Sequence, residues 1–515
     1  MSDLKQAPID FGERFAALQT NTSAIKAVAS AIEGTLGPKG LDTMLVDAYG
    51  NVIITNDGVT ILNKMDVHHP AAKMVIEVAR AQQRELGDGT TTATILSSEL
   101  LIEAVKQVDK GVSIPKVIAG IKQGITFAID YLQSHSRKII SLEKQQIFQA
   151  TFVAGREHQD IAELIVKAAR LIGQDKLLDS QFKFADIIVA DEGSSNELIE
   201  GLIINKKRMN SEMPNSLSNI RLLAIQDAFE PEDIDEEALG TEIGFAKYLE
   251  YKERFKQNLT KLVSIGVNVI AVDRGVDPLA EEFCIDHGIM VVQRLNSKDM
   301  KRIIEHSGAK PLKRTGLHKD TVELEKYLGF AEKIEEDDRL QKLKITKGSG
   351  KPTATILVGA STGEIVEERE RIAKDAAASL QATMKGGYVP GGGSIELYIA
   401  RQLEKQREQV KGLEGFGLQA VANALRKQMA QIVQNAGFNP LEKLEEVKAI
   451  QAELDKDTIG INTDTGQWMD MEKEGILDPT LIKIQALKAA GELSEAILRI
   501  HTIIKMKRED EKDFD

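Results

Sequence analysis

The two ends of this chain resemble each other and differ from its middle, and this contrast constrains the fold more than any other feature. Up to about Arg137, and again from about Gly391, apolar residues return at three- and four-residue intervals, as they do on amphipathic helices. The expected helical stretches are 23–35, 71–86, 92–108, 394–406, 415–435 and 481–505. We therefore expect the two ends to fold together as one helical domain.

The middle of the chain has the pattern of an α/β domain. Short β-branched runs at 187–189, 201–204 and 267–272 alternate with helical segments. Because both flanks are helical, this domain is predicted to be inserted into the helical one. Such an insertion can pivot on the domain that carries it.

Composition excludes several classes of protein. With 515 residues, 42% of them hydrophobic, the chain is long enough for two to four domains. Its formal charge of −13 disfavours a general nucleic-acid binder. Cys284 is the single cysteine, the first residues lack the pattern of a signal peptide, and no apolar run is long enough for a bilayer. We therefore predict a cytoplasmic protein with neither nucleic acid nor membrane as a partner.

Three glycine-rich turns stand out, and none of them is the phosphate-binding loop of ordinary P-loop proteins, GxxxxGK[ST]. The turn at 35–40 closes a predicted helix, and those at 87–92 and 390–393 each open one. Taken singly, each turn is also explained as an ordinary helix cap.

The turn Gly87-Asp88-Gly89-Thr90-Thr91-Thr92 is the most informative of the three. Glycines allow close approach of the backbone, and the free amides of a helix N-terminus attract phosphate. A carboxylate beside phosphate is repulsive unless a cation lies between them, so Asp88 predicts a bridging magnesium ion. The alternative is that Asp88 only caps the helix, which leaves the run of threonines unexplained.

Two further aspartates are candidates for chemistry. Asn56-Asp57-Gly58 follows a strand-like stretch at 51–55, where Asp-Gly is also a turn signal by itself. Asp375 lies in a helical segment, where a lone aspartate usually faces solvent.

Six motifs, taken together and in order, resemble the signatures of the chaperonin family. They are Leu36-Gly37-Pro38-Lys39-Gly40, Asn56-Asp57-Gly58-Val59-Thr60, Gly87-Asp88-Gly89-Thr90-Thr91, Arg371-Ile372-Ala373-Lys374-Asp375-Ala376, Pro390-Gly391-Gly392-Gly393 and Gly475-Ile476-Leu477-Asp478-Pro479. Each motif is weak alone, but the resemblance runs from about Phe11 to Lys505 and is specific for that reason.

The resemblance implies a multidomain chaperonin fold: an α-helical equatorial domain, a small α/β intermediate domain and an α/β apical domain with a helical protrusion. The implied segments are equatorial 1–139, intermediate 140–200, apical 201–353, intermediate 354–390 and equatorial 391–515.

The resemblance also implies the site residues and cofactors, which are ATP or ADP and Mg²⁺. Asp57 and Asp375 match the pair that orients and activates the attacking water, and Asp88 matches the magnesium ligand. The residues implied to hold nucleotide are Leu36, Gly37, Pro38, Asn56, Gly58, Gly89, Thr90, Thr91, Thr92, Arg156, Gly391, Gly392, Asn462 and Asp478. Arg156 stands where relatives with a built-in lid tend to carry a phosphate-sensing lysine; it keeps the charge on a longer, forked side chain.

Two features resemble the group II type, the thermosome-like chaperonins with a built-in lid, more than the bacterial type. The C-terminal residues lack the Gly-Gly-Met-rich tail of the bacterial type, and 229–261 falls where the lid protrusion lies. The helix from Tyr248 to Leu262 carries an apolar stripe, which is also typical of a helix packed on its own domain; the stripe consists of Tyr248, Tyr251, Phe255, Leu259 and Leu262. The departures from the family pattern suggest a divergent branch, of the kind found in some bacteria.

The predicted function is an ATP-hydrolysing chaperone whose identical subunits form stacked rings that enclose non-native polypeptides, with no separate co-chaperonin lid. One alternative is a holdase that binds unfolded chains without productive hydrolysis, but a passive binder needs none of Asp57, Asp88 and Asp375. Another is a metabolic nucleotide-using enzyme such as a small-molecule kinase, for which no separate set of substrate-binding residues is evident.

Overall fold

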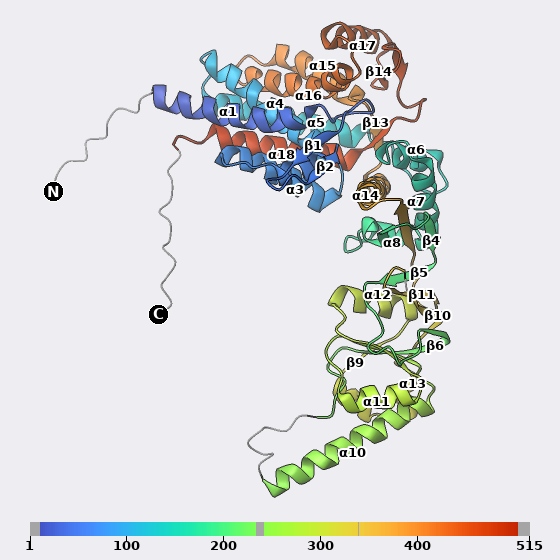
Figure 1. The fold of residues 1–515 in the computed structure, drawn as a ribbon. Coiled ribbons are helices and arrows are strands. Elements are labelled where there is room, and N and C mark those ends of the chain that lie inside the picture. Colours follow the sequence, from blue (N-terminus) through green and yellow to red (C-terminus); the bar gives the residue numbers. More distant parts are fainter. Residues whose placement is uncertain (1–10, 233–240, 338, 503–515) are drawn as a thin grey trace, which may run out of the picture. The chain divides into compact units, whose positions relative to one another are not determined.

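The computed structural model describes residues 11–232, 241–337 and 339–502, and the chain divides into two compact units (Figure 1). Unit 1 comprises Met1–Val166, Leu177–Ala185 and Arg371–Asp515, and unit 2 comprises Lys167–Lys176 and Asp186–Glu370. Unit 1 therefore draws on both ends of the chain, and nearly all of unit 2 is one insertion between them.

Unit 1 is built mainly from helices. They are α1 (Phe11–Glu33), α2 (Gly58–Lys64), α3 (Pro70–Leu86), α4 (Thr90–Asp109), α5 (Ile114–His135), α6 (Gln145–Ala154), α15 (Ser394–Gln409), α16 (Gly415–Asn435), α17 (Pro440–Leu454) and α18 (Thr480–Leu498). Three more helices cross the division between the units along the chain: α7 (Gln159–Ile172), α8 (Gln174–Leu178) and α14 (Gly363–Gly386).

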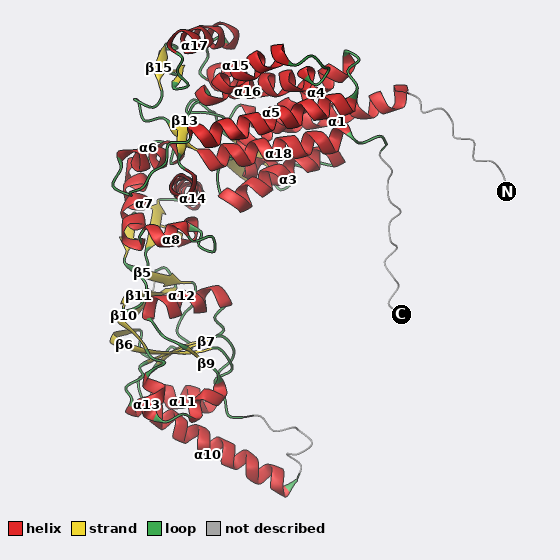
Figure 2. Cartoon of the chain, turned by 180° about the vertical axis from the view of Figure 1, so that it is seen from behind, coloured by secondary structure: helices red, strands yellow, loops and turns green. Residues whose placement is uncertain are grey.

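One hydrophobic core joins the two ends of the chain. Helix α4 packs against α1 and α3 from its own end and against α16 and α18 from the other (Figure 2). Ile25 and Leu101 are fully buried in the same core as Leu425 and Ile497. Removing this apolar surface from water holds the two ends together.

Three short antiparallel strand pairs accompany the helices of unit 1. They are β1 (Thr43–Val46) with β2 (Val52–Thr55), β13 (Tyr388–Pro390) with β16 (Leu477–Pro479), and β14 (Ile459–Ile461) with β15 (Trp468–Asp470). The second pair joins residues that are far apart in the sequence.

Unit 2 contains a seven-stranded mixed sheet with helices on both faces. Its strands are β5 (Gly201–Ile204), β6 (Ser216–Ile225), β7 (Val269–Val272), β8 (Met290–Val292), β9 (Pro311–Leu312), β10 (Gly329–Asp337) and β11 (Lys342–Gly348). The order is β5-β11-β10-β6-β7-β8, with β9 paired to β6. The pairs of β6 with β7 and β9, and of β7 with β8, are parallel, and the others are antiparallel.

Alternate residues of β6 enter two different cores, as expected for a strand covered on both faces. Leu223 and Ile225 join the core of α10 (Glu242–Ser264), α11 (Pro278–Asp286) and α13 (Thr321–Glu325). Leu222 and Ala224 join the core that includes α12 (Ser297–Ser307). A smaller sheet has the order β3 (Ile188–Glu192), β12 (Thr355–Ala360) and β4 (Glu197–Ile199).

The helices expected from periodicity are present, and two of them have clearly different bounds. The stretch expected at 23–35 is α1, which begins already at Phe11 and ends at Glu33. The stretch expected at 481–505 is α18, which ends at Leu498 with Arg499 as its C-cap, and residues 503–505 lie outside the described part. The strand expected at 267–272 begins at Val269; just before it, the side chain of Asn268 accepts a hydrogen bond from the Arg221 amide of β6.

Helix α10 occupies part of the predicted lid protrusion, and its two halves have different surroundings. Phe255, Leu259 and Leu262 are buried in the core of unit 2, as the alternative of a packed helix predicts. Near the other end, Ile243 and Phe245 are 83% and 54% exposed. Residues 233–240 of the protrusion lie outside the described part of the chain.

The five segment boundaries of the predicted equatorial, intermediate and apical domains remain predictions. Among the residues that the structure describes, no helix is long and apolar enough to cross a membrane.

Candidate functional site

Unit 1 gathers three aspartates from three elements. Asp57 is the N-cap of α2, Asp88 lies in the turn between α3 and α4, and Asp375 lies on α14. The Oδ2 atom of Asp57 accepts hydrogen bonds from the amide and hydroxyl of Thr60, at 2.9 and 2.6 Å. An aspartate that only forms a turn and caps a helix would make these same hydrogen bonds. The Oδ1 atom of Asp57, however, has another partner.

That partner is Arg371, which sequence reasoning placed in a motif without giving it a role. Its Nη1 atom lies 3.3 Å from Asp57 Oδ1 and 3.7 Å from Asp375 Oδ2. Arg371 and Asp375 are four residues apart on α14 and share one face of the helix. The three side chains are 15%, 8% and 16% exposed for Arg371, Asp57 and Asp375, so solvent screens their charges only weakly.

Two of the three aspartates, Asp375 and Asp88, have a raised pKa. Burial, and then the charge of Asp88, raise the pKa of Asp375 well above its usual value, although the Arg371 guanidinium opposes this. Burial also raises the pKa of Asp88 to about 6, with further contributions from Asp478 and Asp57. The Gly89 amide, which donates to Asp88 Oδ1 at 2.6 Å, and Arg156 act in the opposite direction. The aspartates thus form one electrostatic cluster.

The N-terminus of α4 lies at this cluster and has no side-chain cap. Its N-cap residue is Gly89, in the left-handed region with φ 80°, so Asp88 is not the cap that the alternative required. A Cβ at position 89 would collide with Ile482, and one at Gly58 would collide with the Thr91 hydroxyl. Gly58 therefore lets the starts of α2 and α4 lie against each other, and Gly89 lets the start of α4 lie against α18. The first amides of α4 have no side-chain cap.

Arg156 reaches the same cluster from the loop after α6. Its Nη1 atom donates a hydrogen bond to Asn56 Oδ1, which also accepts from Arg371 Nη2 at 3.3 Å. Arg156 lowers the pKa of both Asp88 and Asp375. The predicted phosphate-sensing cation is therefore brought to the predicted phosphate site.

The loop after α1 is held in place by α16. Asn435 Nδ2 donates to the carbonyl oxygens of Glu33 and Leu36, at 2.9 and 2.8 Å. Gly37 has φ 86° and packs on Ile432, which leaves space for glycine and little more. Pro38 follows in this turn.

The turn at Gly391 and Gly392 lies beside Asp478. Val389 pairs with Asp478 across β13 and β16, and a Cβ at Gly391 would lie 2.9 Å from Asp478 Oδ1. At Gly392, φ is 62° and a Cβ would collide with the end of Met471. Asp478 also contributes to the pKa of Asp88, so this turn and the cluster lie near each other.

Sequence reasoning missed a buried lysine next to this turn. Lys483 Nζ lies 2.7 Å from Asp478 Oδ2 and also contacts Glu396 Oε1; the side chains of Lys483 and Glu396 are each 7% exposed. Burial disfavours the charged lysine, but the two carboxylates outweigh it and raise the pKa of Lys483. The signal available in the sequence was a single lysine in the apolar start of α18.

Asn462 is the predicted site residue with the weakest support. Its Oδ1 atom accepts from the amides of Asp464 and Thr465, at 2.9 and 3.0 Å, and so forms the turn between β14 and β15. An ion pair of 2.5 Å between Lys39 and Asp464 links this turn to the loop after α1.

Among the described residues, no group of three or more His, Cys, Asp and Glu side chains is arranged to hold a metal ion by itself. The cluster does combine uncapped helix amides, carboxyl groups with raised pKa values and two arginines. Such a site can bind a polyanion, and a divalent cation shared with that polyanion would offset the repulsion between the carboxylates.

The family model of the TCP-1/cpn60 chaperonins matches residues 28–508. A thermosome subunit of Pyrococcus abyssi is 34% identical, over 96% of this chain and 92% of its own length, and the alpha subunit of the Thermoplasma acidophilum thermosome gives the same figures. A crystal structure of a group III chaperonin in the open state is 43% identical, with a TM-score of 0.84, and covers 96% of this chain and 100% of its own.

The higher identity to the group III structure than to the thermosomes agrees with a branch that diverged from them. A bacterial source remains a prediction. Thermosome subunits are ATP-hydrolysing chaperonins, and the match covers nearly the whole chain rather than one motif. This chain belongs to the TCP-1/cpn60 chaperonin family, as an ATP-dependent subunit of the group II type.

Proposed function

We propose that the aspartate cluster of unit 1 binds Mg²⁺ and ATP and hydrolyses the nucleotide, and that hydrolysis drives the enclosure of non-native polypeptides within a double ring. One observation carries the proposal. Three aspartates and two arginines meet at the uncapped N-terminus of α4, so groups for phosphate binding and for water activation lie together.

The phosphates would lie on the first turn of α4. The amides of Thr90, Thr91 and Thr92 would donate to them, and Gly89, whose own amide donates to Asp88, would let them approach the backbone closely. The dipole of α4 favours negative charge there. Leu36, Gly37, Pro38, Asn56, Gly58, Arg156, Gly391, Gly392, Asn462 and Asp478 would form the rest of the nucleotide site. Lys483 would fix the position of Asp478 in this site through their ion pair.

Asp88 would hold the magnesium ion. Mg²⁺ is usually held by one or two carboxylates together with phosphate oxygens rather than by a cage of protein side chains. A single carboxylate beside the uncapped amides of α4 fits this pattern, and so does the lack of a three-ligand cluster in the described part of the chain. When bound, the ion would neutralise phosphate charge and polarise the terminal phosphoryl group.

Asp57 and Asp375 would orient the attacking water and accept its proton. Oδ2 of Asp57 is occupied by Thr60, so Oδ1 is the atom that faces Arg371 and the reacting groups. The raised pKa of Asp375 makes its carboxylate a better proton acceptor. Arg371 would keep the two carboxylates near each other against their mutual repulsion.

The test of this site is Asp375→Asn. We expect hydrolysis to fall by roughly 10²- to 10⁴-fold because the proton acceptor is lost. The Kd for ATP should change by less than about threefold, because Asp375 touches water rather than the nucleotide. Fluorescence of Trp468, the single tryptophan, which pairs across β14 and β15 with the residue before Asn462, can report binding. Asp130→Asn, an exposed change on α5, is the matched control. Near-normal turnover by Asp375→Asn would refute the assignment.

Two exposed apolar surfaces support the assembly and the lid. On the β1–β2 hairpin, Met44, Val46 and Ile54 are 61%, 62% and 57% exposed, which suits contact with a neighbouring subunit of a ring. On α10, the exposed Ile243 and Phe245 suit contact between lids. Electron micrographs of the purified protein should show stacked rings; small particles alone would contradict the assembly.

The division into equatorial, intermediate and apical domains is part of the same proposal. It would place Asp57 and Asp375 in different domains, so that water is activated only when a hinge between them closes. Cytoplasmic location and the absence of a separate lid protein remain predictions.

A further inference from the structure

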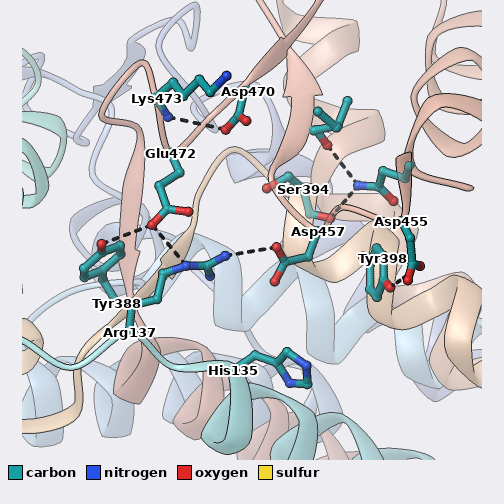
Figure 3. Close-up of polar contacts among 12 residues, drawn as sticks. His135, Arg137, Tyr388, Ser394, Tyr398, Asp455, Asp457, Asp470, Glu472 and Lys473 are labelled. Carbon is teal, nitrogen blue, oxygen red and sulfur yellow. Dashed lines mark hydrogen bonds and ion pairs between the residues drawn. The ribbon is translucent and has the colours of Figure 1, made fainter. Parts of the chain in front are cut away.

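A second arginine of unit 1 lies between two carboxylates, and neither of them belongs to the aspartate cluster (Figure 3). Arg137 follows the end of α5, and none of the roles above uses it. Its Nη2 atom lies 3.1 Å from Asp457 Oδ1, and its Nε atom lies 3.0 Å from Glu472 Oε1. The planar guanidinium thus binds the two carboxylates through different nitrogen atoms.

The register of the β14–β15 hairpin explains why the two carboxylates face each other. Ile459 pairs with Asp470, and Met471 donates its amide to the carbonyl of Thr458 at 2.8 Å. Continuing this antiparallel register by two residues beyond the strands places Asp457 opposite Glu472 at the root of the hairpin. Two facing carboxylates repel each other unless a cation lies between them, and Arg137 supplies the cation.

The same hairpin carries two parts of the proposed nucleotide site. At its tip, the Asn462 amide donates to the Gln467 carbonyl at 2.8 Å and opens the turn described above. At its root, the end of Met471 occupies the space over Gly392 that a Cβ would need. A movement of the hairpin would therefore displace both the Asn462 turn and the side chain that packs on Gly392.

Tyr388 adds a third contact at the root. Its hydroxyl donates to Glu472 Oε1 at 3.1 Å, and its backbone exchanges two hydrogen bonds with Arg137, at 2.9 and 3.1 Å. Burial, and then the charge of Glu472, raise the pKa of Tyr388 to about 12, so its hydroxyl remains a donor at neutral pH. All of unit 2 lies in the chain between Arg137 and Tyr388, so the root of the hairpin is joined to the segments of unit 1 that come before and after the insertion.

We propose that Arg137 is a positioning residue of the nucleotide site: by holding Asp457 and Glu472 together, it places the β14–β15 hairpin as the wall beside the ribose and base. This inference rests on the nucleotide site proposed above. The contacts are partly shielded from solvent, since the side chains of Arg137, Asp457 and Glu472 are 29%, 12% and 32% exposed. They should therefore contribute more than a fully exposed ion pair.

The test is steady-state hydrolysis of ATP by the full-length Arg137→Gln protein. We expect the KM and the Kd for ATP to rise about tenfold, and kcat to change by less than about twofold, because ground-state and transition-state binding weaken equally. The KM of Arg137→Lys should lie between those of the unmodified protein and Arg137→Gln. Lysine keeps the positive charge, but it cannot bind both carboxylates at once as the forked guanidinium does. The matched control is Arg80→Gln, which removes an exposed arginine of α3 paired with Glu77 and should behave as the unmodified protein.

Glu472→Gln is the second variant, for the case that Arg137→Gln does not fold. This variant loses the ion pair between Arg137 and Glu472 but keeps the one between Arg137 and Asp457, so the KM for ATP should rise only about threefold. An unchanged KM in the variant that folds, or a loss of kcat as large as the loss of kcat/KM, would overturn the inference. If Asp375→Asn is inactive in the same assay, that outcome refutes only the role of Arg137. If Asp375→Asn keeps full turnover, the proposed nucleotide site itself is wrong.

Discussion

Lys483 of unit 1 and His306 of unit 2 are both buried, but unit 1 keeps its group charged and unit 2 keeps its group neutral. Unit 1 buries ionised groups in matched sets, such as Lys483 with Asp478 and Glu396. In unit 2, the buried His306 is uncharged: burial, and then the nearby Arg302, lower its pKa to about 4. The contrast suits two tasks, because a highly charged ligand needs preorganised charges, whereas a surface that moves polypeptides needs apolar side chains on a neutral scaffold.

The largest effect in this comparison of the two units is expected from Lys483→Met. This change leaves Glu396 and Asp478 without their shared cation, and breaking a buried pair from one side costs about 3–5 kcal/mol. We expect the free energy of unfolding to fall by that amount in urea titrations of the full-length protein, followed through Trp468, which lies in unit 1.

Lys488→Met is the matched control, on the same helix and with an exposed side chain. It should leave the transition within about 0.5 kcal/mol of the unmodified protein. Equal, small effects of the two changes would show that the buried charges of unit 1 are not balanced as described.

The second prediction concerns how the stability of unit 2 depends on pH. The folded-state pKa of His306 lies below the unfolded value, so the unfolded chain binds more protons between about pH 4 and 6.5, and stability falls as the pH falls through that range. With an unfolded pKa of about 6.5, this one group should destabilise unit 2 by about 2 kcal/mol between pH 7 and pH 5.

His306→Gln should remove this part of the pH dependence, because the amide oxygen of glutamine can accept the Gly348 amide that His306 Nε2 accepts, at 3.0 Å. The measurement is the urea midpoint by circular dichroism at pH 7 and pH 5. His287→Gln, an exposed change in the same unit, is the control. A pH dependence that survives in His306→Gln would assign it to other groups.

The smallest effect on stability is expected from the exposed apolar residues of α10. A combined change of Ile243, Phe245 and Leu249 to serine should alter the unfolding free energy by less than about 0.5 kcal/mol per site, because these side chains are 83%, 54% and 51% exposed. If α10 serves as the lid, the variant should keep rings and ATP hydrolysis but no longer protect an enclosed protein from protease.

Leu441→Ser provides the control, since Leu441 is 82% exposed on α17 of unit 1. Protection that persists in the serine variant of α10 would contradict the lid. These three side chains are a better target than deletion of the whole predicted protrusion, because deletion would also remove Phe255 and Leu259 from the core of unit 2.

Much of the fold could be predicted from local patterns. Helix α3 begins with Pro70 at its first turn and ends at Gly87 in the left-handed region, and both signals are readable in the sequence. The turn at 87–92 was likewise expected to open a helix, and α4 begins there at Thr90; that no side chain caps it is visible only in the structure. The end of α18 was missed because its periodic pattern continues past Leu498, where the helix stops.

The residues expected to touch nucleotide, metal or water were predicted from the sequence, but the residues that hold them in position were not. Asp57, Asp88 and Asp375 were found from motifs, and the structure gathers them. Arg371 was visible in its motif, but nothing in the spacing shows that it also reaches Asp57.

The sequence alone determined the elements that depend on neighbours along the chain: the turns that require glycine, the amphipathic faces and the nesting of an α/β segment between two helical ends. Only the tertiary structure decided which charges meet. Arg137 pairs with Asp457 and Glu472, and Lys483 with Glu396, across long stretches of chain. The free energy of such a pair depends on distance and burial, and both are set by packing of the whole unit rather than by the residues on either side.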